Sequence, residues 1–317
     1  MGMMIFSILF GAALLYLGAE LLVRSAVQIA TYFNIPRLVI GLTVIAFATS
    51  APEAIASVIG QIRGVTGDIA LGNVIGSNIA NVGLVLGIYF LLRPCDVSKE
   101  LKWQKMPLLF FIYLLVFLIM LGGKITLLEG SFLLFVMIVY IALQYYLPEK
   151  KAAIEEEIKV HEESKKKPKT IVFQVCSILG SAVLLVFGSR FLVDGAIEMG
   201  TSFGLSERVI GISVVAIGTS LPEVATAIVA AFRKEEEIIV GTVLGSNIFN
   251  PLLTLFCATT VKTIKFSSSM IFIDFPLMVA FSILLWVLMI LGKSRLSRLD
   301  GSILLVSYLF YVIFLFL

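Results

Sequence analysis

The sequence predicts an all-α polytopic membrane protein with ten transmembrane helices, arranged as two inverted five-helix repeats. Three observations predict this fold: an apolar composition, a series of hydrophobic windows of membrane-spanning length, and two motifs that each occur twice. Of the 317 residues, 59% are hydrophobic and 14% are charged, and the mean hydropathy is +1.06. Such a composition lies outside the soluble globular range and is typical of a polytopic membrane protein.

The hydrophobic windows set the number of helices. A helix needs about 20 apolar residues to cross roughly 30 Å of hydrocarbon. Ten windows meet this requirement, at 3–23, 38–60, 69–92, 106–122, 125–147, 171–193, 209–231, 238–261, 269–291 and 300–317. The segment after the fifth window carries acidic and basic runs and has no apolar face to bury. We therefore expect a first repeat at 1–147, a charged linker at 148–170 and a second repeat at 171–317.

The basic residues predict the orientation. Of the 24 Lys and Arg residues, 18 fall in odd-numbered loops and 6 in even-numbered loops, when Arg190 near the end of the sixth window is counted with the sixth loop. Short loops rich in Lys and Arg favour the cytoplasmic side. We therefore expect an integral protein of the cell membrane with both termini outside and the 148–170 linker in the cytoplasm. Because five is odd, the second repeat enters from the opposite side, as in secondary transporters that alternate access to a midplane site.

The first repeated motif places a carboxylate inside the membrane twice. GLTVIAFATSAPE at 41–53 and GISVVAIGTSLPE at 211–223 share seven of thirteen positions, and they end in Glu53 and Glu223. A charged side chain at the middle of a membrane helix costs about 2.5 to 3.5 kcal/mol, so its default interpretation is functional. No Lys or Arg lies in the second to fifth or the seventh to tenth windows to neutralise these acids. Their matched places in two repeats predict one shared site.

Each glutamate follows other groups that carry oxygen. Thr49 and Ser50 lie four and three residues before Glu53, so all three share one stripe of a helix. A proline precedes each glutamate, and because proline has no N–H we expect main-chain carbonyls to be freed one turn earlier, near 46–49 and around 218. The corresponding side chains of the second copy are Thr219, Ser220 and Glu223.

The second motif adds neutral oxygens from the opposite wall. GNVIGSNIAN at 72–81 and GTVLGSNIFN at 241–250 share seven of ten positions. Ser77 and Asn81 are four residues apart, and Ser246 and Asn250 match them. Oxygen ligands with carboxylates suit Ca²⁺ or Na⁺, and the motifs contain no His or Cys that would favour a softer metal.

The charge of this site predicts exchange. Two ionised glutamates in a dehydrated site require about two positive charges, so one Ca²⁺, two or more Na⁺, or protons can satisfy them, whereas an empty site is costly. An obligatory exchanger follows from that cost. If three Na⁺ exchange for one Ca²⁺, each cycle moves net charge, worth about 2.3 kcal/mol per 100 mV.

Other classes of protein fit the sequence less well. The net charge of +3 reflects loop residues and does not indicate nucleic-acid binding. The three cysteines have no pair or metal spacing, so neither a disulfide framework nor a zinc site is implied. We expect no cofactor besides the transported Ca²⁺ and Na⁺. The windows contain no metalloprotease HExxH motif or Ser/His arrangement of an enzyme. A channel could use the same acidic constriction, but inverted repeats favour alternating access.

Some polar residues keep two interpretations. Asn78 and Asn247 fit either interhelical hydrogen bonds or ion contacts. Asp194 and Glu198 lie near the end of the sixth window, where interfacial solvation is the simpler account and an entrance to the site is the functional one.

The two ATSAPE-type segments, each followed by GSNI-x-N, strongly resemble the sodium/calcium exchanger family of the cation/calcium antiporter superfamily. The resemblance covers nearly the whole chain. It implies a secondary active antiporter that exchanges Na⁺ for Ca²⁺, with helices 2–5 and 7–10 around the ions and with helices 1 and 6 sliding to switch access. It also implies which oxygens bind: those of Glu53, Glu223, Thr49 and Thr219, the carbonyls of Ala46 and Ala216, and Ser77 and Ser246 at outer Na⁺ positions.

The sequence departs from the family pattern at three positions. Asn250 stands where many members, including potassium-dependent ones, carry aspartate, so we expect K⁺-independent exchange. Ala48 replaces a glycine and Ala51 a leucine, changes that are conservative in size. Proton-coupled relatives have asparagine in place of the Thr-Ser pair before the glutamate, which leaves H⁺/Ca²⁺ antiport as the alternative. The expected partners are Ca²⁺, Na⁺ and the lipid bilayer, and we expect the protein to function as a monomer.

Overall fold

The computed structural model describes residues 2–33, 35–62, 67–146, 171–202, 218, 220–292 and 295–316. Within these residues, nine helical spans are long and apolar enough to cross a membrane. They coincide with nine of the ten predicted windows, and the seventh window, 209–231, is described only at 218 and from 220 onward. The predicted all-α polytopic fold is confirmed, while the linker at 148–170 lies outside the described residues.

The helices, π-helical segments (η) and two-residue strands follow one another in a similar order in both halves. The first half contains α1 (Gly2–Tyr32), α2 (Arg37–Ile40), η1 (Gly41–Ile45), α3 (Ala46–Ile62), α4 (Gly67–Ala80), η2 (Asn81–Leu86), α5 (Gly87–Leu92), β1 (Cys95–Asp96), η3 (Leu101–Lys105), α6 (Met106–Met120), β2 (Lys124–Ile125) and α7 (Leu127–Tyr146). The second half contains α9 (Ile171–Ser202), α12 (Leu221–Arg233), α13 (Glu236–Phe249), η6 (Asn250–Thr254), α14 (Leu255–Val261), β3 (Ile264–Lys265), η7 (Met270–Asp274), α15 (Phe275–Leu291), β4 (Arg295–Leu296) and α16 (Arg298–Phe316).

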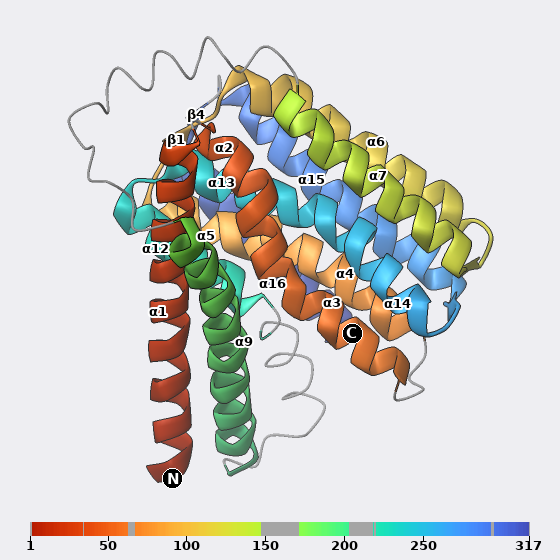
Figure 1. Ribbon diagram of the computed structural model, residues 1–317. Helices are drawn as coiled ribbons and strands as arrows, with labels where there is room; N and C mark the ends of the chain where they lie inside the picture. Colours follow the sequence, from red (N-terminus) through yellow and green to blue (C-terminus); the bar gives the residue numbers. More distant parts are fainter. Residues whose placement is uncertain are drawn as a thin grey trace.

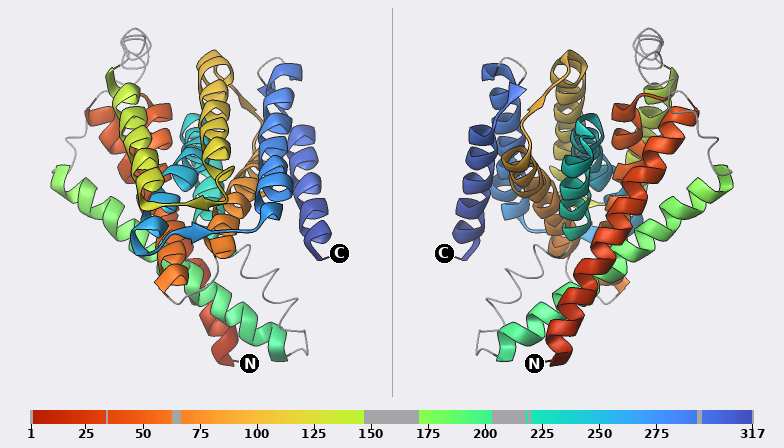
Figure 2. Two further views of the ribbon diagram at one scale, coloured as in Figure 1. Left: turned by 90° about the vertical axis from the view of Figure 1, so that its right-hand side faces the viewer. Right: turned by 90° about the vertical axis from the view of Figure 1, so that its left-hand side faces the viewer.

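The first helices of the two halves, α1 and α9, lie side by side and run in opposite directions (Figure 1). Ser7 near the start of α1 donates a hydrogen bond to the carbonyl of Phe191, and Gln28 near the end of α1 accepts one from Gln174 near the start of α9. Because these helices occupy the same place in their repeats, their antiparallel course means that the repeats are inverted. Both views in Figure 2 show the pair extending past the lower edge of the other helices.

Two small strand pairs join the halves by the same symmetry. β1 pairs antiparallel with β4, and β2 pairs antiparallel with β3. The repeat offset of 169–171 residues relates β1 to β3 and β2 to β4. Each pair therefore contains one strand from each half, and exchanging the halves converts one pair into the other.

The second and third helices of each half form the centre of the bundle. The span Glu236–Val261, which is α13 with η6 and α14, is buried throughout its apolar window, whereas only 28% of the window of α1 is buried. The helices around this centre are capped by paired side chains. Glu129 accepts hydrogen bonds from the N–H and hydroxyl of Thr126 at the start of α7, and Asp300 does the same with Ser297 at the start of α16.

The proline of the first motif does not break its helix. α3 contains Pro52 and remains helical from Ala46 to Ile62. The carbonyl of Ala48, four residues before Pro52, loses its main-chain donor because proline has no N–H. The irregularity precedes α3, in the π-helical turn η1.

Candidate cation site

The polar stripe of the first motif lies inside the protein. Thr49, Ser50 and Glu53 on α3 each have a relative exposure of 0%. The hydroxyl of Thr49 lies 3.4 Å from the carbonyl oxygen of Ala46, one turn earlier. The structure therefore groups four of the predicted oxygen donors on one buried face of α3.

The second motif copy presents its carboxylate at the start of a helix. Glu223 lies in the first turn of α12, where the helix dipole favours negative charge, and it has a relative exposure of 1%. Ser220 is also buried, just before the helix begins. The carbonyl of Gly218 accepts a 2.5 Å hydrogen bond from Ser189 of α9. The predicted ligands Ala216 and Thr219 lie outside the described residues.

The two glutamates lie close enough to repel each other electrostatically. Thr49 of α3 lies beside Glu223 of α12, so the stripe of one repeat reaches the carboxylate of the other. The acids that form ion pairs among the described residues are others, namely Glu20, Asp96, Glu100, Glu235 and Glu236. In the described part of the chain, no fixed cationic side chain is bonded to Glu53 or Glu223.

The opposite wall comes from α4 with the start of η2 and from α13 with the start of η6. Ser77, Asn81, Ser246 and Asn250 are all buried, at 0 to 3% exposure. The hydroxyls of Ser246 and Thr49 lie 3.3 Å apart, which joins this wall to α3. All the predicted ligand side chains that the structure describes are therefore buried at the interface of the two repeats.

Several of these buried oxygens have no hydrogen-bond partner within the described structure. A buried polar atom without a partner costs roughly 1–3 kcal/mol, and such atoms are rare in folded proteins. Nearly all the unpartnered side-chain oxygens belong to the predicted site. They are Ser50 Oγ, both carboxylate oxygens of Glu53 and of Glu223, Ser77 Oγ, Asn81 Oδ1, Ser220 Oγ and Asn250 Oδ1, together with Thr254 Oγ1 and the hydroxyl of Tyr89.

One residue of this region, Thr254, was not identified from the sequence, and two others, Asn78 and Asn247, kept two interpretations there. Thr254 follows Asn250 by four residues, and only that spacing could have indicated it. Asn78 and Asn247 form hydrogen bonds between the repeats, which confirms the interhelical interpretation of these two asparagines.

The chemistry of the cluster is that of a site for hard cations. Two carboxylates with hydroxyl and amide oxygens match the ligands that Na⁺ and Ca²⁺ prefer. In the described ranges no three or more His, Cys, Asp or Glu side chains lie together so that they could hold a metal ion. The two carboxylates would therefore need neutral oxygens to complete a cation site. The three cysteines are free.

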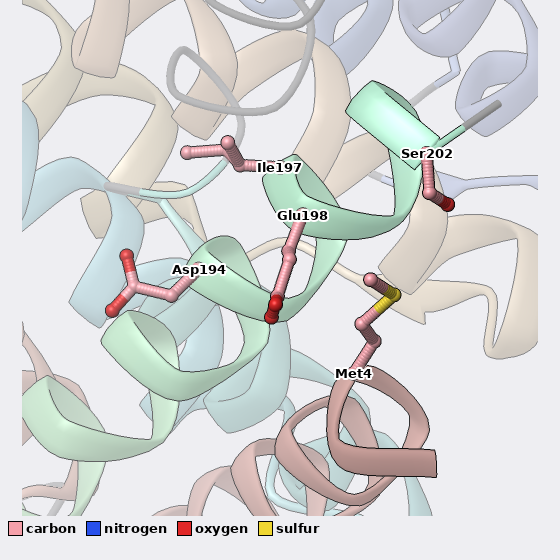
Figure 3. Close-up of a pocket in the computed structure, with 5 residues that line it drawn as sticks. All are labelled: Met4, Asp194, Ile197, Glu198 and Ser202. Atoms are coloured by element: carbon pink, nitrogen blue, oxygen red, sulfur yellow. The ribbon is translucent and has the colours of Figure 1, made fainter. Parts of the chain in front are cut away.

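The acids proposed for an entrance lie at a different place. Asp194 and Glu198 are exposed near the end of α9. Together with Met4, Ile197 and Ser202 they line a shallow pocket between the ends of α1 and α9 (Figure 3). None of the predicted ligands lines this pocket.

Comparisons with known proteins agree with this geometry. The family model described as "Sodium/calcium exchanger protein" matches residues 3–146 and 173–317. The putative antiporter CaxA of Alkalimonas amylolytica is 34% identical over 313 residues, which cover 98% of this chain and 97% of the relative. The sodium/calcium exchanger MaX1 of Methanosarcina acetivorans is 28% identical, with 98% and 97% coverage. A solved structure of the sodium-calcium exchanger NCX_Mj, soaked with Na⁺ and Ca²⁺, has a TM-score of 0.80 at 28% identity and covers 98% of this chain and 97% of its own.

Proposed function

This chain belongs to the sodium/calcium exchanger protein family, and from that premise we propose that it exchanges Na⁺ for Ca²⁺ across the membrane by alternating access. The single observation that carries the proposal is the pair of buried carboxylates, Glu53 and Glu223, which come from inverted repeats. Among the described residues, no Lys or Arg side chain forms an ion pair with either of them. Their charge must be balanced by ions that enter from solution. A site that is costly when empty binds one cargo as it releases the other, and this is exchange.

The proposed ligands surround both carboxylates. Glu53 and Glu223 bind both kinds of ion, because charge balance requires both acids whichever ion is present. The neutral donors are the side chains of Thr49, Thr219, Ser50, Ser220, Ser77, Ser246, Asn81 and Asn250 and the carbonyls of Ala46 and Ala216. The burial of the described members of this set supports the assignment, as do the missing hydrogen-bond partners of their side-chain oxygens other than those of Thr49 and Ser246.

The charge of the site also bears on coupling. With asparagine at both 81 and 250, the described cluster contains two carboxylates and no third. We therefore propose exchange that does not require K⁺. Exchange of three Na⁺ for one Ca²⁺ moves net charge in each cycle, so the transport rate responds to membrane potential.

The proposed topology follows from the loops. Both termini lie outside the cell membrane, the linker at 148–170 lies in the cytoplasm, and the repeats are 1–147 and 171–317. The distribution of Lys and Arg supports this orientation. Each repeat contributes one carboxylate to a site within a single chain, which supports function as a monomer.

Transport into proteoliposomes of the purified protein tests the proposal. An outward Na⁺ gradient is expected to drive uptake of ⁴⁵Ca²⁺ without K⁺ on either side, and an imposed diffusion potential is expected to change the initial rate. Protein-free liposomes provide the control. Uptake that follows a pH gradient and ignores Na⁺ would identify an H⁺/Ca²⁺ antiporter instead, and rapid uptake without any counter-ion gradient would identify a channel.

A further inference from the structure

Four asparagines join α4 and its extension η2 to α13 and its extension η6, and they do so symmetrically. Asn250 donates to the side-chain oxygen of Asn78 at 2.9 Å, and Asn81 donates to that of Asn247 at 3.0 Å. Asn78 in turn donates to the main-chain carbonyl of Asn247 at 3.0 Å, and Asn247 donates to that of Asn78 at 3.3 Å. All four side chains are buried.

The main-chain carbonyls determine how the first two amides point. A carbonyl oxygen only accepts hydrogen bonds, so the end of Asn78 that faces the carbonyl of Asn247 must be its NH₂ group. The same argument fixes Asn247 against the carbonyl of Asn78. The NH₂ group of Asn78 also donates a 3.3 Å hydrogen bond to the hydroxyl of Tyr113. The oxygen ends of Asn78 and Asn247 are therefore the ends that face Asn250 and Asn81.

The orientation then passes to the second two amides. An oxygen must be met by a donor, so Asn250 and Asn81 turn their NH₂ groups toward Asn78 and Asn247. Their own oxygens necessarily point the other way. Those two oxygens, Asn250 Oδ1 and Asn81 Oδ1, are buried and have no partner among the described residues. An amide turned over at either position would direct an NH₂ group, which cannot bind a cation, to the same place.

We propose that Asn78 and Asn247 are positioning residues, which hold the amides of Asn250 and Asn81 so that only oxygen faces the transported cations. The inference rests on the proposed function, because it concerns the same site. It differs from a merely structural role in one respect. Asn78 acts on ion binding through Asn250, and Asn247 acts through Asn81, each across the boundary between the repeats.

A double-mutant cycle measures this dependence. Asn78→Leu and Asn250→Leu, singly and together, are reconstituted and assayed for the external Ca²⁺ concentration that gives half-maximal Na⁺-driven uptake. Each single substitution is expected to raise this concentration by about tenfold, the effect of one lost interaction. Because Asn78 acts through Asn250, the double variant is expected to need no higher Ca²⁺ concentration for half-maximal uptake than Asn250→Leu alone. Asn247→Leu with Asn81→Leu gives the second cycle.

A control variant separates positioning from packing. Thr242 of α13 is buried and donates a hydrogen bond within its own helix to Ile238, so Thr242→Val removes a polar group without touching the asparagines. It is expected to keep the wild-type half-maximal concentration. Asn78→Ser replaces Asn78→Leu in the cycle if the leucine variant does not fold.

The outcomes are distinct. Losses that multiply in the double variants would overturn the positioning role while leaving the exchanger intact. Absence of Na⁺-driven Ca²⁺ uptake by the wild-type protein would overturn the proposed function itself. Melting temperatures measured with and without Ca²⁺ report binding independently of transport, and in this readout too the double variant is expected to match Asn250→Leu.

Discussion

The α1–α9 pair and the central helices are built in different ways. In the central span of α13, η6 and α14 the apolar window is entirely buried, whereas 28% of the window of α1 and 33% of that of α9 are buried. The centre is joined by the side-chain amides of four asparagines and by the hydroxyls of Thr49 and Ser246. The outer pair is joined by close backbone contact at Gly11 and Gly188 and, near its two ends, by the hydrogen bonds of Ser7 and Gln174.

This difference teaches how one fold can bind ions firmly and still move. Hydrogen bonds between buried amides fix a geometry, because breaking them leaves unpaired polar groups. We therefore expect the centre to hold the cations as one unit while α1 and α9 move past it.

The largest expected effect comes from the charges at the centre. Glu53→Gln and Glu223→Gln each remove half of the negative charge that balances the cations, and loss of one partner from a buried charged site costs about 3–5 kcal/mol. Each variant is expected to lower Na⁺-driven ⁴⁵Ca²⁺ uptake by roughly a hundredfold or more. Asp96→Asn, the same chemical change at an exposed acid, is the matched control and is expected to retain activity. Undiminished exchange in either glutamate variant would refute the shared site.

The outer pair offers the next test, which separates movement from binding. A Cβ atom at Gly188 would lie 2.7 Å from the main-chain nitrogen of Leu15, so Gly188→Ala must push α1 and α9 apart. Such overpacking costs about 1–3 kcal/mol. We expect roughly tenfold slower transport, with the Ca²⁺-induced rise in melting temperature unchanged because the ligands lie in the centre.

The same helix supplies the control for this test. A Cβ atom at Gly180 would meet nothing within 4 Å, so Gly180→Ala is expected to transport normally. Equal slowing by both substitutions would show that the effect comes from the alanine itself and not from the contact. Loss of Ca²⁺ stabilisation in Gly188→Ala would show that the pair and the centre are not separate units.

The sequence predicted the centre better than the outer pair. A charge inside an apolar window is costly, so Glu53 and Glu223 were visible without a structure, and the duplication predicted that they meet. The window of the first helix, 3–23, stopped well short of the observed end at Tyr32. The window ended early because Glu20, Arg24 and Gln28 lower the local hydropathy. The helix nevertheless continues past them, since polar side chains on a helix about 45 Å long can reach water or polar partners.

The asparagines show what a sequence leaves undetermined. Asn78 and Asn81 are the same residue type, three positions apart, and the motif does not say which of them presents oxygen to the site. That distinction depends on main-chain carbonyls about 169 residues away. The unbroken course of α3 through Pro52 was likewise decided by its surroundings, because packing of the whole bundle outweighs the loss of one hydrogen bond.

A smaller effect is expected where the amide network meets an added charge. In Asn250→Asp a carboxylate oxygen replaces the NH₂ group that faces the Asn78 oxygen. Two acceptors repel unless a proton lies between them, so the variant is expected to bind a proton in competition with cations. We expect Ca²⁺ uptake to be retained and to change a few-fold per pH unit across the range where wild-type uptake is nearly constant. Flat profiles for both proteins would contradict this.

The smallest expected effect concerns an ion pair between α1 and the end of α12. Glu20 of α1 bonds to Arg233 at the end of α12, and both side chains are partly exposed, at 29% and 37%. The repeat mate of Glu20 is Arg190, so the inverted position on α9 cannot form the same pair. An exposed pair contributes about 0.2–1 kcal/mol. Glu20→Gln is therefore expected to raise the maximal exchange rate about twofold, because it weakens the contact of α1 with α12. The Ca²⁺ concentration that gives half-maximal uptake is expected to stay the same.

A charge swap provides the control. The double variant with Glu20→Arg and Arg233→Glu is expected to restore the original rate. A double variant that behaves like Glu20→Gln would show that the attraction between these two charges does not limit the movement of α1.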